Sequence, residues 1–156
     1  MSIKLASQKI IKNWIDYNGH MNVAYYLLIF DKFGADNLNN IFDIGEHSAK
    51  TTGMSTMMVE SNITYNQELK LDDEVDINLL YFDHDKKRLQ YKFEMVHRKK
   101  EYLASTFEAL VLYVNLNTRK VQEFEEYKVK IMDDFILKNE SNFSTEDLKL
   151  SSKLKK

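Results

Sequence analysis

Apolar residues are spaced in two different ways along the chain, and the spacing separates a helical part from a part made of strands. Between residues 23 and 41 they recur three or four positions apart, with one gap in the middle, at Val23, Leu27, Phe30, Leu38 and Ile41. This spacing predicts a helix of about five turns. Its first half is apolar on every side, which is typical of a buried helix. We expect the helix to be ended by Asn39, Asn40 and Gly45.

After residue 53 apolar and polar residues alternate, which is the pattern of β-strands. The alternation predicts four long strands, at residues 57–65, 75–81, 89–95 and 103–114. A shorter strand is predicted before the helix, at residues 7–14, where Ile10 and Ile11 form a β-branched pair. The links between the long strands are too short for parallel crossovers. The sequence therefore predicts an antiparallel sheet.

The remaining segments complete the predicted domain. Residues 46–53 read as a polar connection, residues 123–138 as a second, surface helix, and residues 139–156 as a polar, flexible tail. Residues 1–138 then form a single domain of the α+β class, with one buried helix against a long antiparallel sheet. Such a sheet has an edge strand, and pairing with a second copy is a common way to cover it. We therefore expect a homodimer or a homotetramer.

Composition and charge narrow the class of protein. The chain has 156 residues, 44% of them hydrophobic and 29% charged, which is ordinary globular usage. The net charge of -2 gives no reason to expect nucleic acid or an anionic membrane as a partner. Cysteine is absent, which excludes disulfides, thiolate metal sites and cysteine nucleophiles. No signal-like or membrane-spanning run is visible, so we expect a cytoplasmic protein.

The segment from Trp14 to Tyr26 concentrates the candidate chemistry. It places a carboxylate, a glycine and a histidine directly before the apolar helix, at Asp16, Gly19 and His20. Gly19 supplies backbone freedom for a bend, and Asn22 is a candidate N-cap. A polar turn that leads into an apolar helix is expected where the start of that helix has a function.

This segment resembles a known family. Asp-Tyr-Asn-Gly-His-Met-Asn at residues 16–22, followed by Tyr26 and Phe30, is similar to the Asp-x-x-Gly-His-(Val/Met)-Asn…Tyr…Phe signature of hotdog-fold acyl-CoA thioesterases of the 4-hydroxybenzoyl-CoA thioesterase group. Within that group, the run is most similar to the pattern of betainyl-CoA thioesterases. Two later stretches, Val59-Glu60…Tyr65-x-x-Glu68 and Ala104-x-Thr106-x-Glu108, resemble the second and fifth strands of the family. The resemblance implies the hotdog fold.

The resemblance also implies a chemistry for the turn. Asp16 would act on the thioester carbon, either as a nucleophile or as a general base on water. Backbone N–H groups around Asn22 and Val23 would stabilise the oxyanion, with Gly19 and His20 shaping the site. A helix N-terminus carries unpaired N–H groups and partial positive charge, which suits an oxyanion and keeps a nearby aspartate ionised. A turn aspartate that only caps the helix is the alternative.

The other candidate residues have two readings each. His20 could orient the substrate carbonyl or only pack locally, and Asn18 and Asn22 fit loop and cap roles better than substrate contacts. Glu60 could be a second carboxylate of the pocket or a strand residue that faces solvent. Aromatic residues could form a cage for a cationic acyl group or belong to the core; they are Trp14, Tyr17, Tyr25, Tyr26 and Tyr65. The other histidines have no ligand spacing, so neither a metal nor a cofactor is expected.

Two functions from different classes remain. The first is hydrolysis of a small acyl-CoA thioester to the free acid and CoA. The alternative is a non-catalytic hotdog protein that binds acyl thioesters or serves as an assembly module. Hydration of enoyl thioesters would need an Asp/His pair in a different motif, which the sequence lacks.

Overall fold

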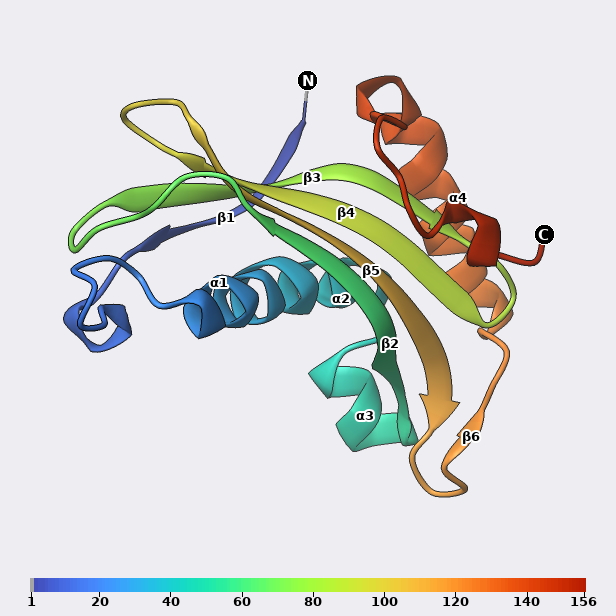
Figure 1. Ribbon diagram of the computed structural model, residues 1–156. Helices are drawn as coiled ribbons and strands as arrows, with labels where there is room; N and C mark the ends of the chain where they lie inside the picture. Colours follow the sequence, from blue (N-terminus) through green and yellow to red (C-terminus); the bar gives the residue numbers. More distant parts are fainter. Residues whose placement is uncertain (1) are drawn as a thin grey trace.

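A curled antiparallel sheet wraps around one long helix (Figure 1). The structure is a computed structural model that describes residues 2–156. The main strands are β1 (Ile3–Lys9), β2 (Met54–Tyr65), β3 (Glu74–His84), β4 (Arg88–His97) and β5 (Leu103–Asn115). Their order in the sheet is β1-β3-β4-β5-β2, and a short strand, β6 (Lys120–Val121), pairs with the end of β5. All pairings are antiparallel, as predicted, and the α+β fold class is confirmed.

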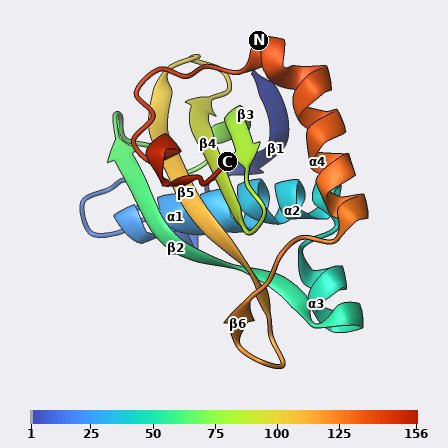
Figure 2. The same cartoon turned by 90° about the vertical axis from the view of Figure 1, so that its right-hand side faces the viewer.

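The long helix lies across the concave face of the sheet (Figure 2). It consists of α1 (Val23–Ile29), a π-helical turn (Phe30–Ala35) and α2 (Asp36–Phe42). The predicted helix is therefore confirmed, and the gap in its apolar pattern falls on the π-helical turn. The helix ends at Asp43, which adopts the left-handed conformation with φ 55°. This is a correction to the expected end at Asn39, Asn40 and Gly45.

The helix and the sheet approach each other most closely at the π-helical turn. The ring of Phe30 stacks on Phe107 of β5, with 5.2 Å between ring centroids. One turn later, a Cβ added to Gly34 would lie 2.8 Å from a ring carbon of Phe93 on β4. Only glycine allows this approach without moving the ring. These contacts fix the position of the helix under the central strands.

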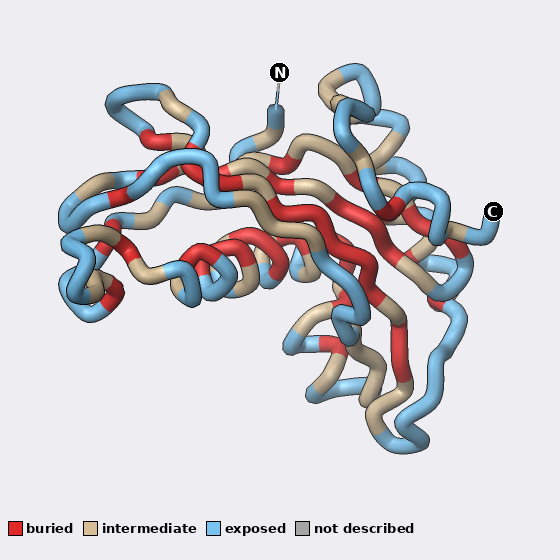
Figure 3. The backbone as a smooth tube through the Cα atoms, viewed as in Figure 1, coloured by how far each residue is buried: buried red, intermediate tan, exposed pale blue. Residues whose placement is uncertain are grey.

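The outer side of α1 is not covered within the single chain. Val23, Leu27 and Leu28 are 55%, 45% and 38% exposed, and Figure 3 shows the exposed side of the helix facing away from the sheet. The expectation that the first half of this helix is buried on every side is therefore wrong for one chain. The sheet can cover only one side of the helix, because its far edge ends at β2.

Two local predictions also need correction. Residues 46–53, expected as a polar connection, form the helix α3 (Glu46–Thr52), in which Lys50 and Glu46 make an ion pair of 2.9 Å one turn apart. The strand expected at residues 7–14 is instead β1, which ends at Lys9, followed by a 3-10 turn at Lys12–Trp14. The backbone of Ile10 bonds to that of residues 72 and 73, and the chain then turns away from the sheet.

The C-terminal part lies at the end of the sheet opposite the Asp16 turn (Figure 1). The predicted surface helix is present as α4 (Glu126–Asn139), followed by 3-10 turns at Glu140–Asn142 and Ser151–Lys153. Residues 143–156, which we call the strap, lie against the convex face of the sheet, where the sequence leads us to expect a flexible tail. The Ser144 N–H donates to the Leu80 carbonyl at 2.8 Å, and Leu150 is buried. No helix within residues 2–156 is long and apolar enough to cross a membrane.

Candidate active site

A tight turn holds Asp16 just before the long helix. The Gly19 N–H donates to the Asp16 carbonyl at 3.0 Å, and the Asp16 N–H donates to the His20 carbonyl at 3.2 Å. Gly19 has φ +79°, a left-handed conformation that favours glycine. The predicted bend at Gly19 is therefore confirmed.

The Asp16 carboxylate accepts one hydrogen bond at each oxygen. Oδ1 accepts the Asn18 N–H and Oδ2 accepts the Asn22 side-chain amide, both at 2.8 Å. The bond from Asn22 lowers the pKa of Asp16 most, followed by the bond from Asn18 and a smaller contribution from His20, against a small opposing effect of burial. The carboxylate is therefore held as an anion in a fixed orientation. Each oxygen keeps a lone pair for a further partner.

Asn22 joins the carboxylate to the start of the helix. Its Oδ1 accepts the Ala24 N–H at 3.0 Å, so it is the N-cap, as expected, while its amide nitrogen holds Asp16. Its backbone N–H donates to the Trp14 carbonyl at 2.9 Å. The expectation that this N–H is an oxyanion donor is therefore wrong, because the group is already used. The Val23 N–H has no acceptor within residues 2–156.

A hollow of about 200 Å³ lies beside this turn. Its walls come from the Asp16 turn, the start of α1 and the loop after β2; they are His20, Met21, Val23, Tyr26, Tyr65, Asn66, Gln67 and Glu68. Tyr26 and Tyr65 meet edge to face, with ring centroids 5.3 Å apart. His20 Nδ1 lies 3.1 Å from the Met21 carbonyl. Since a carbonyl only accepts, the neutral ring carries its proton on Nδ1 and leaves Nε2 unprotonated.

Several predicted pocket residues lie elsewhere in the single chain. Trp14 is buried and stacks on Tyr25 at 5.8 Å, and the side chain of Tyr17 is 96% exposed. Asn18 is exposed in the turn and contributes only its backbone N–H. The predicted aromatic cage is therefore reduced, within one chain, to Tyr26 and Tyr65.

Glu60 lies on the opposite face of the sheet from the helix. It is exposed and pairs with Leu110 of β5, and directly opposed residues share a face. Leu110 in turn pairs with Gln90, whose side chain bonds Glu108 under the strap. Glu60 therefore points toward the convex face and does not line the hollow beside Asp16, where the second carboxylate of the single chain is Glu68.

The loop between β2 and β3 is the part of the site that sequence reasoning missed. The Met21 N–H donates to the Leu69 carbonyl at 2.7 Å, which holds this loop against the Asp16 turn. The Tyr102 hydroxyl donates to the Glu68 carbonyl at 2.7 Å from the other side. The spacing Tyr65-x-x-Glu68 was the available signal, but it did not indicate that the loop forms a wall.

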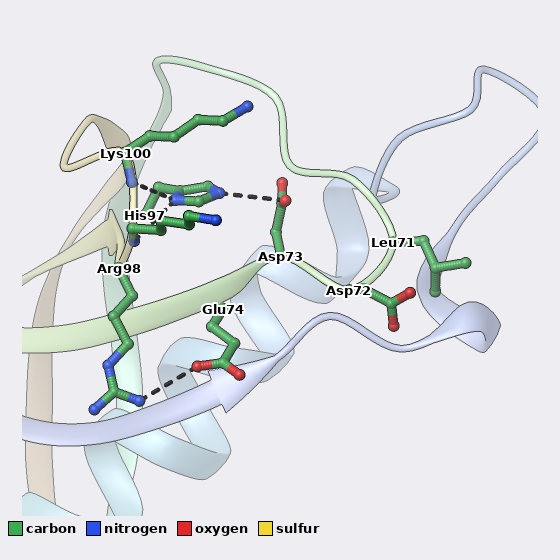
Figure 4. A pocket seen from close by; sticks show the side chains of 8 residues that line it. Leu71, Asp72, Asp73, Glu74, His97, Arg98 and Lys100 are labelled. Carbon is green, nitrogen blue, oxygen red and sulfur yellow. Dashed lines mark hydrogen bonds and ion pairs between the residues drawn. The ribbon is translucent and has the colours of Figure 1, made fainter.

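Two further hollows continue from this loop along the same end of the molecule. One of about 190 Å³ shares Gln67 and Glu68 with the hollow beside the Asp16 turn. Another of about 490 Å³ shares Asp73 and Lys100 with that second hollow (Figure 4). The three hollows therefore adjoin one another and run from the start of α1 to the turn between β4 and β5.

The far end of this groove carries unpaired positive charge. Its carboxylates have partners, since Glu74 lies 3.3 Å from Arg98 and Asp72 lies 3.5 Å from Lys9. The ammonium groups of Lys99 and Lys100 form no ion pair or hydrogen bond within residues 2–156. Three carboxylates and three cations line this hollow, so Lys99 and Lys100 are the cations there that can still pair with an anion. Residues 2–156 contain no cluster of three or more metal-ligating side chains.

Comparison with known proteins is consistent with this geometry. Residues 11–136 match the model of a family described as the Thioesterase-like superfamily. A betainyl-CoA thioesterase of Pseudomonas aeruginosa is 26% identical over 116 residues, which cover 74% of this chain and 72% of that protein. Two solved structures share the fold. A Staphylococcus aureus protein in complex with CoA has a TM-score of 0.81 and 24% identity, covering 100% of this chain and 94% of that chain. A 1,4-dihydroxy-2-naphthoyl-CoA thioesterase from Synechocystis has a TM-score of 0.73 and 12% identity, covering 86% and 97%.

Proposed function

This chain belongs to the Thioesterase-like superfamily, and we propose that it is an acyl-CoA thioesterase that hydrolyses the CoA thioester of a small acyl group with Asp16 as the reacting carboxylate. The observation that carries this proposal is the fixed, ionised state of Asp16 at the start of a helix, held by Asn18 and Asn22 at 2.8 Å each.

Two routes lead from Asp16 to the same products. As a nucleophile, the carboxylate attacks the thioester carbon, the C–S bond breaks, CoA leaves as its thiolate, and water then cleaves the resulting anhydride. As a general base, Asp16 takes a proton from water, the hydroxide attacks the carbon, and the C–S bond breaks in the same way. In both routes the acid and the CoA thiol are released and Asp16 is regenerated.

The Val23 N–H is the proposed donor to the oxyanion. It belongs to the first residue of α1 and has no acceptor within residues 2–156. A donor of this kind stabilises the charge that develops on the thioester oxygen, and losing one typically costs ~100-fold or more in rate. His20 lines the same hollow, and its role in orienting the substrate is part of the proposal.

The size and the lining of the hollow beside the turn favour a small acyl group as the substrate. Its volume is about 200 Å³, and the rings of Tyr26 and Tyr65 line it together with the carboxylate-bearing Glu68. Aromatic faces and a nearby carboxylate favour a cationic group. The relative from Pseudomonas aeruginosa is named for betainyl-CoA, whose acyl group carries a trimethylammonium cation. Betainyl-CoA is therefore the first substrate to test.

The groove indicates where the CoA end of the substrate would bind. The phosphates of CoA are anionic, and the unpaired ammonium groups of Lys99 and Lys100 lie at the end of the groove far from Asp16. With the acyl group beside Tyr26, we propose that the CoA arm follows the groove toward this turn. Replacing both lysines with alanine should weaken binding of CoA more than binding of pantetheine, which lacks those phosphates.

A homodimer through β2 is the proposed assembly. β2 is an unpaired edge of 12 residues and carries an exposed apolar run at Met57, Met58 and Val59. The exposed side of α1 adds Val23, Leu27 and Leu28. Apolar surface of this kind is typical of a subunit interface. Light scattering should give a dimer, and Val59→Lys should give a monomer; a monomeric wild-type protein at micromolar concentration would contradict this assembly.

A thiol-release assay over a panel of acyl-CoAs tests the proposed function. We expect turnover of short acyl-CoAs, betainyl-CoA among them, and loss of that turnover in Asp16→Asn. Unchanged turnover in Asp16→Asn would remove Asp16 from its proposed role. The alternative, a non-catalytic protein that binds acyl thioesters, predicts binding of acyl-CoA by calorimetry without thiol release from any member of the panel.

A further inference from the structure

His97 is a buried histidine at the end of β4, and it takes no part in the chemistry proposed for Asp16. It is 4% exposed and lines the groove together with Lys99 and Lys100. Figure 4 shows His97 and Lys100 at this hollow. Its Nδ1 accepts the backbone N–H groups of Lys99 at 3.2 Å and of Lys100 at 3.0 Å. An atom that accepts two N–H groups carries no proton, so the ring proton sits on Nε2.

The other ring nitrogen connects this turn to the loop that forms the acyl hollow. Nε2 lies 3.2 Å from Asp73 Oδ1, although it is not aligned for a hydrogen bond. The second oxygen of Asp73 accepts the Lys70 N–H at 2.8 Å, inside the loop between β2 and β3. The ring of Tyr102 packs on His97 with centroids 4.9 Å apart, and its hydroxyl holds the same loop at Glu68. His97 therefore contacts both the turn between β4 and β5 and Asp73, the last residue of the loop between β2 and β3.

The geometry points to a positioning role: we propose that His97 fixes the backbone of the turn between β4 and β5, so that Lys99 and Lys100 are held toward the phosphate-bearing end of CoA. This inference rests on the proposed acyl-CoA function and adds a residue to it. His97 itself contacts neither the acyl group nor the thioester. Its effect on the ligand passes through the two lysines whose N–H groups it accepts.

The Nδ1 atom is the part of the His97 side chain that holds the turn. Without it, the backbone N–H groups of Lys99 and Lys100, two exposed turn residues, lose their side-chain acceptor, and the turn is freer to find another conformation. Glu101 in this turn adopts a left-handed conformation with φ 60°, which is unfavourable for a residue with a side chain. Two backbone bonds close the turn, from the Glu101 N–H to the His97 carbonyl at 2.8 Å and from the His97 N–H to the Tyr102 carbonyl at 2.9 Å. The side chain of His97 adds two further hydrogen bonds at the lysines.

Two variants of His97 with side chains of similar shape, one with an acceptor and one without, test the acceptor alone. In His97→Asn the amide oxygen occupies the place of Nδ1 and can accept the same N–H groups, whereas His97→Leu has the same shape and no acceptor. Calorimetric titration of each with CoA and with pantetheine gives the readout. We expect CoA to bind His97→Leu about tenfold more weakly than His97→Asn, the effect of roughly one well-made hydrogen bond. Pantetheine should bind the two variants equally.

A second buried histidine provides the control for loss of a core imidazole. His84 lies at the other end of the sheet, where Nε2 contacts Asp133 at 2.6 Å and Nδ1 contacts the Asp85 carbonyl at 3.0 Å. His84→Leu should lower thermal stability and leave the affinity for CoA unchanged. If His84→Leu weakens CoA binding as much as His97→Leu does, the positioning role is overturned.

The remaining outcomes separate this inference from the proposed function. Equal affinity of His97→Asn and His97→Leu for CoA would overturn it, as would an equal loss of pantetheine binding. Binding of CoA by the wild-type protein without hydrolysis of any thioester would refute the enzyme function while leaving the comparison of variants valid. A wild-type protein that binds no CoA at millimolar concentration would overturn both.

Discussion

Asp16 and Glu108 are both carboxylates held by N–H donors, but their surroundings differ. Glu108 on β5 is 2% exposed and accepts the N–H groups of Lys149 and Leu150 at 2.8 and 2.7 Å, together with the Gln90 amide at 2.9 Å. Asp16 accepts two N–H groups at 2.8 Å in a turn that is open to solvent. Glu108 therefore has three donors and Asp16 has two, and the bonds are of similar length.

The origin of the donors does distinguish them. The donors to Asp16 come from two and six residues away, so they orient the carboxylate within its own turn. The donors to Glu108 come from 18, 41 and 42 residues away, so that carboxylate joins β4, β5 and the strap. A carboxylate whose lone pairs are used by distant segments holds the fold together. One that is held locally and remains open can still react.

The largest expected effect is the loss of activity in Asp16→Asn. The amide cannot ionise, so it can serve neither as nucleophile nor as base, and we expect kcat/KM to fall about 100-fold or more. Because Asp16 is an open turn residue, the melting temperature should change by no more than about 2 °C. Thiol release and thermal unfolding of the same preparation check both statements. A large drop in melting temperature would place Asp16 in the same class as Glu108.

Glu108→Gln should give the reverse pattern. The amide leaves a donor facing the N–H groups of Lys149 and Leu150, which we expect to lower the free energy of unfolding by about 1–3 kcal/mol. For a chain of this size that corresponds to several degrees in melting temperature. Turnover at 25 °C should equal that of the wild type. A loss of turnover without a loss of stability would show that the convex face communicates with the Asp16 turn.

The sequence alone predicts the elements in which apolar residues recur at a regular spacing. The long helix and the central strands were predicted because they alternate or repeat over many residues, and the bend at Gly19 because few residues adopt its φ. The sequence does not show which side chains of β2 face the helix. Its register shifts between Met58 and Glu60, and such a bulge changes which residues face the helix. A strict alternation through Val59 therefore assigns some of these side chains to the wrong face.

The strap and the groove depend on contacts that leave no local pattern. Residues 139–156 are polar, and nothing in them shows that a carboxylate 41 residues earlier accepts their backbone N–H groups. Similarly, the Asn22 N–H looks free in the sequence, yet it is used by the carbonyl of Trp14. The resemblance located Asp16, whereas only the folded structure shows which N–H donors around it remain free.

The hydrogen bond from Asn22 tests how the local donors tune Asp16. This bond is the main reason that the pKa of Asp16 lies below its ordinary value, so Asn22→Ala should raise the pKa. The acid limb of kcat/KM, which reports protonation of Asp16, should then move to higher pH. Asn22→Asp should move it further, since it adds a like charge, but it should keep the N-cap that Asn22→Ala loses at about 1 kcal/mol. Identical acid limbs in all three proteins would show that Asp16 does not set that limb.

The smallest expected effect concerns Asp85, which anchors the end of the strap. Burial raises the pKa of Asp85, but hydrogen bonds from Lys155, Lys87 and Arg88 outweigh it and hold the pKa below its ordinary value. A carboxyl whose pKa is lowered by folding stabilises the protein above the pKa of the unfolded chain, about 3.9, and loses that contribution as the pH falls through its folded value. Asp85→Asn should therefore be less stable than the wild type at pH 7, by about 1 kcal/mol.

The difference between the two proteins should shrink as the pH falls below about 4, because the unfolded wild-type chain then binds a proton at Asp85 that the folded protein does not hold, and the charge-dependent part is gone once the folded carboxyl is protonated too. Urea unfolding of both proteins at several pH values measures this difference. The other carboxylates are the same in both, so their contribution cancels. A difference that stays constant down to pH 3 would mean that the hydrogen bonds to Asp85 do not depend on its charge. In that case the strap would be held by shape and apolar contacts, such as that of Leu150, and a buried carboxylate would tell little about how the strap is fixed.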